Sequence, residues 1–144
     1  MQAFVLCGIP GSGKTTLAKQ LAEQFDANVH SIDDIPGLWG VPDTEGKNFR
    51  TWMDNIRADL RTGKSVVCDS LAVNAESRMW IIKELSGFDC EKILYVKAVP
   101  LDVCLRRNRD RERKLPDEQI RIVARCLEAP TAEECWDKIF VCKD

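Results

Sequence analysis

One short motif near the N-terminus restricts the fold of this 144-residue chain more than any other feature. Residues 8–15, GIPGSGKT, match the pattern G-x-x-x-x-G-K-[ST] and follow the apolar run AFVLC at 3–7. The glycines Gly8, Gly11 and Gly13 let the backbone approach phosphate groups closely, and consecutive N–H groups, including that of Ser12, can point at them. The motif therefore predicts a phosphate-binding loop that follows a strand.

The residues after the motif predict the helix that such a loop requires. Leu17, Leu21 and Phe25 recur at the spacing of one helical face. The positive N-terminal end of this helix would attract phosphate. Lys14 is then placed to bridge the β- and γ-phosphates, and the hydroxyl of Thr15 to bind Mg²⁺. A glycine-rich turn that matches the motif by chance is the alternative, and the strand–loop–helix context argues against it.

Length and charge limit the classes of protein to which the chain can belong. With 144 residues it forms one domain, residues 1–144, around a single core. A net charge of −2 and 44% hydrophobic residues indicate a globular protein rather than a disordered chain or a general polyanion binder. Any contact with nucleic acid must therefore come from a local patch.

The seven cysteines and the N-terminus indicate a cytoplasmic protein. The cysteines are odd in number and have no C-x-x-C spacing, which favours reduced thiols over a disulfide framework or a zinc site. The single histidine, His30, has no neighbouring ligand in sequence, so we expect it to be structural. The N-terminal apolar run meets Gly8 and Pro10 too soon for a signal peptide or a membrane span. We expect no membrane contact, and no obligate protein partner is evident.

Strand-like and helix-like segments alternate along the chain. Short apolar runs predict strands at 4–7, 28–32, 65–68, 93–98 and 138–142. Helical periodicity predicts helices at 14–25, 47–62, 75–85, 101–111 and 117–127. This alternation predicts an α/β fold in which a five-stranded parallel sheet has helices on both faces and right-handed crossovers. Ligands of such a sheet bind beyond the carboxyl ends of its strands.

Two adjacent carboxylates, Asp33 and Asp34, follow the second predicted strand. In that place an aspartate can accept the proton of a hydroxyl that attacks a γ-phosphate. A helix N-cap or a turn accounts for the pair equally well. In the segment 37–46 that follows, Trp39 could stack on a base or close the edge of the domain, and we favour the second role.

A third strand ends in Asp69 and Ser70. An acid there can orient the water around Mg²⁺ or bind the acceptor substrate. It could instead cap the next helix, but Asn74 is the clearer cap, which favours a functional role for Asp69.

Residues 106–125 contain the largest charge bias of the chain. Eight basic residues stand against four acidic ones. A solvated helical face with mixed ion pairs is one interpretation. The other is an arginine-bearing lid, at about 106–118, that closes over a triphosphate and excludes water. Pro116 lies where such a lid would continue into its second helix, and we favour the lid.

Taken together, these segments resemble the polynucleotide-kinase-like group of P-loop kinases, which includes phage-type polynucleotide 5′-kinase domains and, more distantly, zeta toxins. The resemblance covers nearly the full chain. The matching segments are residues 8–16, 31–34, 69–70, 74–78, 99–100, 107–111 and 130–139.

The resemblance implies roles for individual residues. It implies that Asp33 is the general base, that Lys14 acts on the triphosphate and that Arg111 is the lid arginine, one helical turn after Arg107. The implied nucleotide contacts are Gly8, Gly11, Ser12, Gly13, Lys14, Thr15, Thr16 and Arg107. The implied acceptor contacts are Asp33, Asp69, Ser70 and Asn74. The implied magnesium ligands are Thr15 and, through water, Asp69.

The chain departs from this group at the acceptor side. Many relatives carry an arginine shortly after the paired aspartates to bind an acceptor phosphate, whereas this chain has Ile35, Pro36 and Gly37. Asp69 and Asn74 are also slightly further apart than in the group.

The resemblance and the motifs together predict a Mg²⁺- and ATP-dependent kinase that phosphorylates a hydroxyl group. The 5′-hydroxyl of a polynucleotide or nucleotide is the leading acceptor. A P-loop kinase for a small metabolite and a nucleotide-binding regulatory module remain as alternatives. The role of Asp33 distinguishes a kinase from a regulatory module. A kinase needs a base that faces an acceptor hydroxyl, whereas a regulatory module needs only an oriented water.

Overall fold

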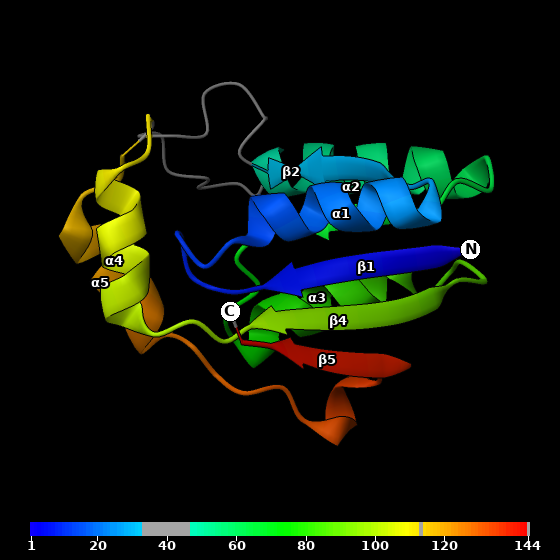
Figure 1. Cartoon of the computed structure of the whole chain (residues 1–144). Coiled ribbons are helices and arrows are strands. Elements are labelled where there is room, and N and C mark those ends of the chain that lie inside the picture. Colours follow the sequence, from blue (N-terminus) through cyan, green and yellow to red (C-terminus); the bar gives the residue numbers. More distant parts are fainter. Residues whose placement is uncertain (33–46, 113, 144) are drawn as a thin grey trace.

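The computed structural model of the chain describes residues 1–32, 47–112 and 114–143. Five strands form one sheet in the order β2-β3-β1-β4-β5. Every neighbouring pair is parallel, so the predicted α/β fold with a five-stranded parallel sheet is confirmed (Figure 1). The strands are β1 (Gln2–Cys7), β2 (Asn28–Ser31), β3 (Val66–Asp69), β4 (Glu91–Lys97) and β5 (Lys138–Cys142).

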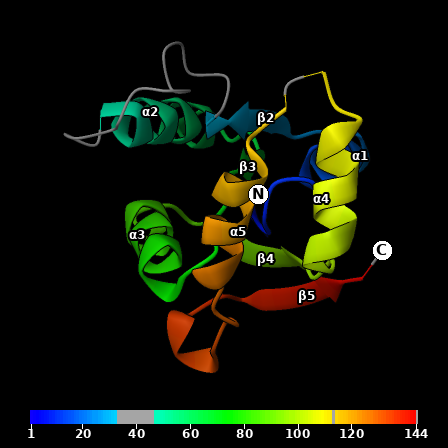
Figure 2. The same cartoon turned by 90° about the vertical axis from the view of Figure 1, so that its left-hand side faces the viewer.

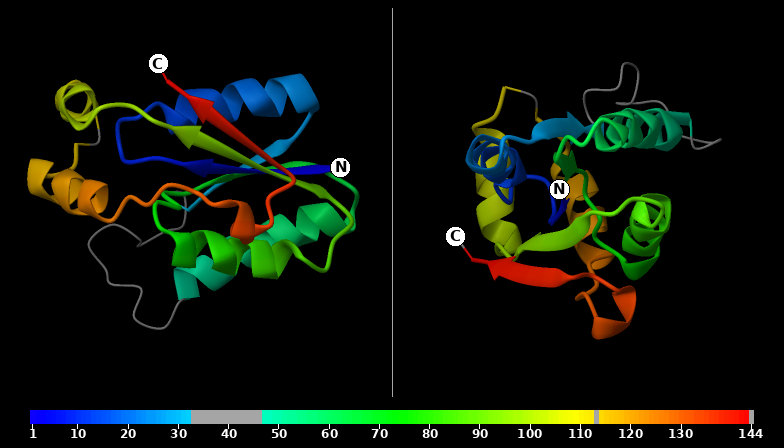
Figure 3. Two further views of the ribbon diagram at one scale, coloured as in Figure 1. Left: turned by 90° about the horizontal axis from the view of Figure 1, so that it is seen from below. Right: turned by 90° about the vertical axis from the view of Figure 1, so that its right-hand side faces the viewer.

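Helices cover both faces of the sheet and one of its ends. They are α1 (Lys14–Phe25), α2 (Lys47–Arg61), α3 (Ala75–Leu85), α4 (Leu101–Arg109) and α5 (Asp117–Arg125), with a 3₁₀ helix η2 (Ala132–Glu134). Helix α1 lies on one face and α2 and α3 on the other (Figure 3). Helices α4 and α5 stand at the end toward which the strands point (Figure 2).

Successive side chains of β1 enter two different cores, one on each face of the sheet. Ala3, Val5 and Cys7 point to the core under α2 and α3, which includes the buried Trp52 and Leu85. Phe4 and Leu6 point to the core under α1. A strand buried on both faces reads as a continuous apolar run, which is why its sequence does not alternate.

Several element ends differ from the sequence prediction, and four of them, including the start of β1 at Gln2 instead of 4, differ by two residues. Helix α4 ends at Arg109 instead of 111 because the N–H of Asp110 turns back to the carbonyls of Arg107 and Asn108. Helix α5 ends at Arg125 instead of 127 in a similar tight turn at Cys126. Strand β4 begins two positions earlier than predicted, at Glu91, where it pairs with Gln2.

The edge strands are more exposed than a buried parallel strand. All but one residue of β5 are exposed, and in β2 Asn28 and Val29 are exposed. On β2, Nε2 of His30 lies 2.6 Å from Oδ2 of Asp59, which is on α2. The backbone carbonyl of His30 accepts a hydrogen bond from the indole of Trp52 at 2.9 Å, so this histidine helps to join β2 to α2.

A buried ion pair joins α3 to the segment that enters β5. Nε of Arg78 donates to Oε1 of Glu134 at 2.7 Å, and both side chains are almost fully buried. The second carboxylate oxygen accepts from Arg78 and from the backbone N–H of Thr131, each at 3.1 Å. The indole of Trp136 donates to Oε1 at 3.1 Å. Burial alone raises the pKa of a carboxyl, but these hydrogen bonds outweigh it and lower the pKa of Glu134.

The seven cysteines are free thiols, and Cys7, Cys68, Cys90 and Cys104 are buried. No helix within residues 1–32, 47–112 and 114–143 has both the length and the apolar composition needed to cross a bilayer.

Candidate active site

The loop between β1 and α1 has the backbone shape that its glycines predict. Gly11 and Gly13 have φ values of 85° and 95°, which side chains rarely adopt. A Cβ atom on Gly11 would lie 2.6 Å from the backbone oxygen of Cys104, and one on Gly8 would lie 2.6 Å from Oγ of Ser12. Gly11 therefore needs glycine both for space and for conformation, Gly13 for its conformation, and Gly8 for the space beside Ser12. Gly13 also precedes α1 without a capping side chain, which leaves the first N–H groups of the helix to other acceptors.

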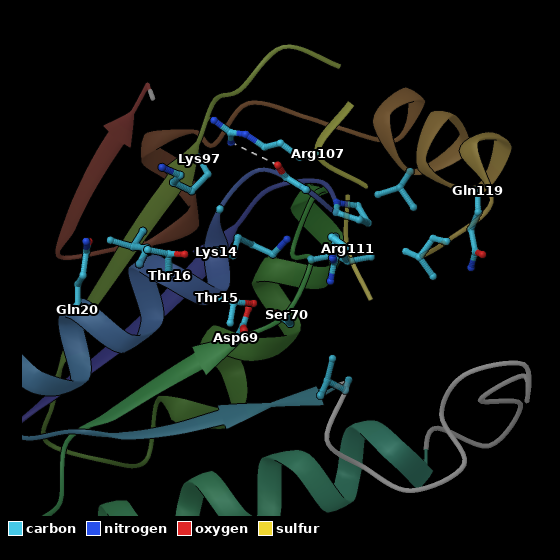
Figure 4. A pocket seen from close by; sticks show the side chains of 18 residues that line it. Lys14, Thr15, Thr16, Gln20, Asp69, Ser70, Lys97, Arg107, Arg111 and Gln119 are labelled. Carbon is cyan, nitrogen blue, oxygen red and sulfur yellow. Dashed lines mark hydrogen bonds between the residues drawn. The ribbon is translucent and has the colours of Figure 1, made fainter. Parts of the chain in front are cut away.

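A cavity of about 630 Å³ lies beyond the carboxyl ends of the strands, against this loop. The side chains of α1, β3, β4, α4 and α5 that line it are shown in Figure 4. Nine residues predicted from the sequence line it, namely Gly11, Gly13, Lys14, Thr15, Thr16, Asp69, Ser70, Arg107 and Arg111. The structure thus brings the predicted phosphate-binding loop, the end of β3 and the basic segment to one place.

Positive charge dominates this cavity. Among the described residues that line it, Lys14, Lys97, Arg107 and Arg111 stand against the single carboxylate of Asp69. Nζ of Lys14 donates to the carbonyl of Ile9 at 3.1 Å. Nη1 of Arg107 donates to the carbonyl of Gly11 at 3.4 Å (Figure 4). Cations that converge on a backbone N–H cradle make a site for a polyanion such as a triphosphate.

Two oxygen donors suit a magnesium ion. Sheet register places Asp69 beside Leu6 of β1, at the carboxyl end of β3, where it is 8% exposed. Asp69 and the hydroxyl-bearing Thr15 point into the same cavity (Figure 4). Mg²⁺ takes hard oxygen ligands and is usually held by one or two protein groups together with phosphates and water. The residues present therefore fit Mg²⁺.

Two buried hydroxyls have no hydrogen-bond partner among the residues that the structure describes. They are Oγ of Ser12, inside the loop, and Oγ of Ser70, at the end of β3. Buried polar atoms are normally paired. Ser70 lines the cavity, so a ligand there can supply its missing partner.

The structure places Asn74 at the N-cap of α3. Its Oδ1 accepts from the backbone N–H of Ser77 at 2.8 Å. The capping role expected from the sequence is therefore confirmed, and Asn74 is not among the residues that line the cavity. A direct contact of Asn74 with the acceptor stays a prediction.

Several predicted residues lie outside the described part of the chain. They include Asp33, Asp34, Trp39 and Arg113. Ile32, which directly precedes Asp33 in sequence, lines the cavity.

Arg111 follows α4 in the connection to α5, and Asn108 holds the ends of that connection together. The carboxamide of Asn108 donates to the carbonyl of Leu115 at 2.7 Å and accepts from its N–H at 3.1 Å. Asn108 is 2% exposed. Pro116 is the N-cap of α5, where the sequence placed a helix start. A small apolar cluster that includes Cys104 and Ile120 packs α4 and α5 against the loop residue Ile9.

The sequence reasoning missed Asn108, Lys97 and Gln119. Lys97 is the last residue of β4, and the rule that ligands bind at the carboxyl ends of strands could have drawn attention to it. Gln119 on α5 and Asn108 on α4 carry no motif of their own, because their positions depend on how the two helices pack.

The cysteines beside the loop are not suited to act as nucleophiles. Burial raises the pKa of Cys7, although Arg78 opposes the shift. Burial also raises the pKa of Cys104, opposed by Arg107. A protonated thiol is a poor nucleophile, so the chemistry of the cavity falls to its charged groups and its hydroxyls.

Known proteins share this chain's fold and motifs. The family model described as AAA domain (AAA_33) matches residues 4–130. L-seryl-tRNA(Sec) kinase of Methanococcus maripaludis is 25% identical over 147 residues, which cover 93% of this chain and 55% of the relative. Protein kti12 of Schizosaccharomyces pombe is 22% identical over 154 residues, which cover 95% of this chain and 55% of that protein. The chain thus spans about half the length of the curated relatives it matches.

Solved structures with a similar fold include kinases of different acceptors. A gluconokinase from Sinorhizobium meliloti 1021 superposes with a TM-score of 0.71 at 19% identity, covering 99% of this chain and 82% of that chain. The Pnkp1/Rnl/Hen1 RNA repair complex contains a chain with a TM-score of 0.76 at 18% identity, covering 88% of this chain and 43% of that chain. At such identities these structures show the fold alone.

The family match spans most of the chain, and the P-loop, the parallel sheet and the order of elements agree with it. The chain therefore belongs to the AAA domain (AAA_33) family of P-loop kinases.

Proposed function

We propose that this chain is a kinase that transfers the γ-phosphoryl group of ATP, with Mg²⁺, to the 5′-hydroxyl of a polynucleotide or nucleotide. The observation that supports it most is the convergence of Lys14, Thr15, Asp69, Arg107 and Arg111 on one cavity beyond the strand ends. Phosphoryl transfer is catalysed mainly by positioning and by charge stabilisation, which this set of residues can supply.

In the proposed reaction the acceptor oxygen forms a bond to the γ-phosphorus, and the bond to the β,γ-bridging oxygen breaks. ADP leaves, and the proton of the acceptor hydroxyl passes to Asp33. The loop N–H groups and Lys14 bind the β- and γ-phosphates, while Arg107 and Arg111 neutralise charge on the transferring group. Thr15 and Asp69 would hold Mg²⁺, which when bound neutralises phosphate charge.

The preference for a nucleic-acid or nucleotide 5′ end rests on the resemblance in the segments 8–16, 31–34 and 107–111. A small-metabolite kinase is the second candidate, favoured by the structural similarity to a gluconokinase at a TM-score of 0.71. A regulatory module that only hydrolyses nucleotide would transfer phosphate to water.

We further propose that the kinase is one domain that works in the cytoplasm, with residues 106–118 as its lid. Seven free thiols favour a reducing compartment. The cavity residues Arg111 and Leu115 belong to the proposed lid.

Transfer of labelled phosphate from γ-labelled ATP tests this function. The assay offers 5′-hydroxyl oligonucleotides, free nucleosides and gluconate side by side, with Mg²⁺ and with EDTA. We expect Mg²⁺-dependent labelling of the oligonucleotide or the nucleoside. Labelling of gluconate alone would support the metabolite kinase, and release of free phosphate without any labelled acceptor would support the regulatory module.

A further inference from the structure

A second cavity, of about 350 Å³, adjoins the phosphate cavity. Ile32 and Ser70 line both, so the two cavities are neighbours at the ends of β2 and β3. The rest of the second cavity lies between α2 and α3 and is lined by Phe49, Trp52, Ala72, Glu76, Ser77, Trp80 and Ile81. A group bound there would extend from the place where the γ-phosphate of ATP is expected.

Aromatic rings form much of this second cavity. The ring centroids of Phe49 and Trp52 are 5.7 Å apart, and those of Phe49 and Trp80 are 6.1 Å apart at an interplanar angle of 78°. Trp52 is buried and its indole N–H donates to the carbonyl of His30, so it is a fixed part of the wall. Trp80 is 60% exposed. An exposed indole that lines a cavity next to other aromatic rings is a surface on which a planar ring can stack.

The charge of the second cavity is opposite to that of the first. Among the described residues that line it, Glu76 alone is charged. A phosphate or carboxylate that entered this cavity would lose water and meet no described cation. The cavity therefore suits a neutral ring and disfavours an anionic acceptor such as a sugar acid.

Ser70, whose buried hydroxyl has no hydrogen-bond partner among the described residues, lines both cavities. A buried hydroxyl without a partner is unfavourable, and a polar group of a ligand relieves this. A sugar hydroxyl next to a stacked base would meet that need, with the base toward Trp80 and the sugar toward the phosphate cavity.

We propose that the second cavity binds the neutral nucleobase of the acceptor nucleoside, stacked on Trp80 beside Phe49, while the sugar lies at Ser70. This inference rests on the proposed kinase function, because the cavity is assigned to the acceptor of that reaction. The acceptor is then a free nucleoside or the terminal nucleoside of an oligonucleotide, and not an acidic sugar.

The first test measures binding without turnover. Adenosine, thymidine and gluconate are titrated into the protein by calorimetry, with the donor site saturated by Mg²⁺ and a non-hydrolysable ATP analogue. We expect both nucleosides to bind and gluconate not to bind. Trp80→Ala should weaken nucleoside binding roughly tenfold or more, the loss that one base–aromatic stack implies. Met79→Ala is the matched control, since Met79 is also exposed on α3, at 55%, and does not line the cavity.

The second test measures transfer to two oligonucleotides, one with a normal 5′ nucleoside and one with a 5′ abasic sugar. We expect kcat/KM to favour the normal substrate at least tenfold in the wild type and in Met79→Ala, and the ratio to fall toward one in Trp80→Ala. Activity on the free nucleoside shows whether further nucleotides are needed.

The outcomes separate this inference from the kinase proposal. Trp80-dependent nucleoside binding without transfer to any acceptor would leave the cavity assignment standing and overturn the kinase proposal. If kcat/KM for transfer depends neither on the presence of the 5′ base nor on the Trp80→Ala change, the kinase proposal stands and the cavity assignment is overturned. Gluconate binding in place of nucleoside would also overturn it.

Discussion

Lys14 is the residue of the phosphate-binding loop whose side chain should contact the phosphates directly. Its ammonium group donates to the carbonyl of Ile9 at 3.1 Å, across the loop that should hold the phosphates. A carbonyl is a weaker partner for a cation than a phosphate is, so nucleotide binding should draw Nζ away from Ile9. Lys14 lines the cavity, where its charge can act on a bound phosphate.

Lys14→Ala should therefore abolish phosphoryl transfer while the protein stays folded. The lysine stabilises charge on the transferring group, and its loss removes that contribution without opening a void in the core. Steady-state kinetics and thermal unfolding measure the two effects. Lys19→Ala, a charge change on the exposed side of α1, is the control and should keep full activity. Equal turnover by wild type and Lys14→Ala would contradict the assignment of the donor site.

The adjacent acids Asp33 and Asp34 should differ sharply from each other. If Asp33 is the base, Asp33→Asn lowers kcat by roughly 10²- to 10⁴-fold and leaves ATP affinity nearly unchanged. Asp34→Asn should have a much smaller effect. Measuring kcat for both variants, with ATP affinity by calorimetry, decides between them. If Asp34→Asn lowers kcat strongly while Asp33→Asn stays active, Asp34 is the general base in place of Asp33.

At the scale of elements, α4, its connection to α5 and α5 itself form one unit over the cavity. The apolar cluster with Cys104 and Ile120 holds the two helices on the loop. Asn108 bonds to both backbone groups of Leu115 and fixes the ends of the connection. Arg111 lies within this connection and lines the cavity. The basic segment is thus attached to the site at both ends, which a purely solvated face would not require.

Arg111→Ala should lower kcat by about 10³-fold or more, with a smaller effect on apparent ATP affinity. An arginine that contacts the γ-phosphate mainly in the transition state contributes on this scale. Arg109→Ala is a matched control from the same segment, because Arg109 is exposed and lies 3.4 Å from Asp117 in a surface ion pair. Such pairs contribute only about 0–1 kcal/mol. If both variants keep near-wild-type kcat on the best acceptor, Arg111 is part of a solvated face.

At the scale of the whole molecule, the sequence was sufficient wherever the signal was local. The loop at 8–15, its helix and the strand-terminal Asp69 all follow from short-range pattern. Gln119 could not be placed in the same way, because its position at the cavity depends on α5 packing against the loop. The cavity between α2 and α3 is likewise a product of long-range packing.

The ion pair of Arg78 and Glu134 is the clearest case of a contact that local pattern does not reveal. Both residues lie in segments that resemble the polynucleotide-kinase-like group, yet 56 positions separate them. Their side chains join α3, which lines the second cavity, to the segment that leads into the edge strand β5. The pair therefore joins the far edge of the sheet to the helix layer, and Nη1 of Arg78 also donates to the carbonyl of Ala72 at 2.9 Å, beyond the end of β3.

Glu134→Gln should destabilise the fold at pH 7 by about 3 kcal/mol, because it leaves the buried guanidinium of Arg78 without its counter-charge. The loss should depend on pH. Since the pKa of Glu134 is lower in the folded chain, its carboxylate stabilises the fold at any pH above its ordinary value of about 4.3. This stabilisation disappears as pH falls through the lowered folded pKa. Wild type and variant should therefore converge in stability in acid.

Urea unfolding of both proteins from pH 7 down to pH 3 measures this convergence. Glu133→Gln is the matched control, because Glu133 is the exposed neighbour of Glu134 on η2 and should give the same stability as wild type at each pH. Because neither Arg78 nor Glu134 lines the phosphate cavity, Glu134→Gln should keep normal kcat at temperatures where it is folded. A gap between wild type and Glu134→Gln that stays constant across the pH range would show that the carboxylate charge is not what stabilises this edge of the sheet.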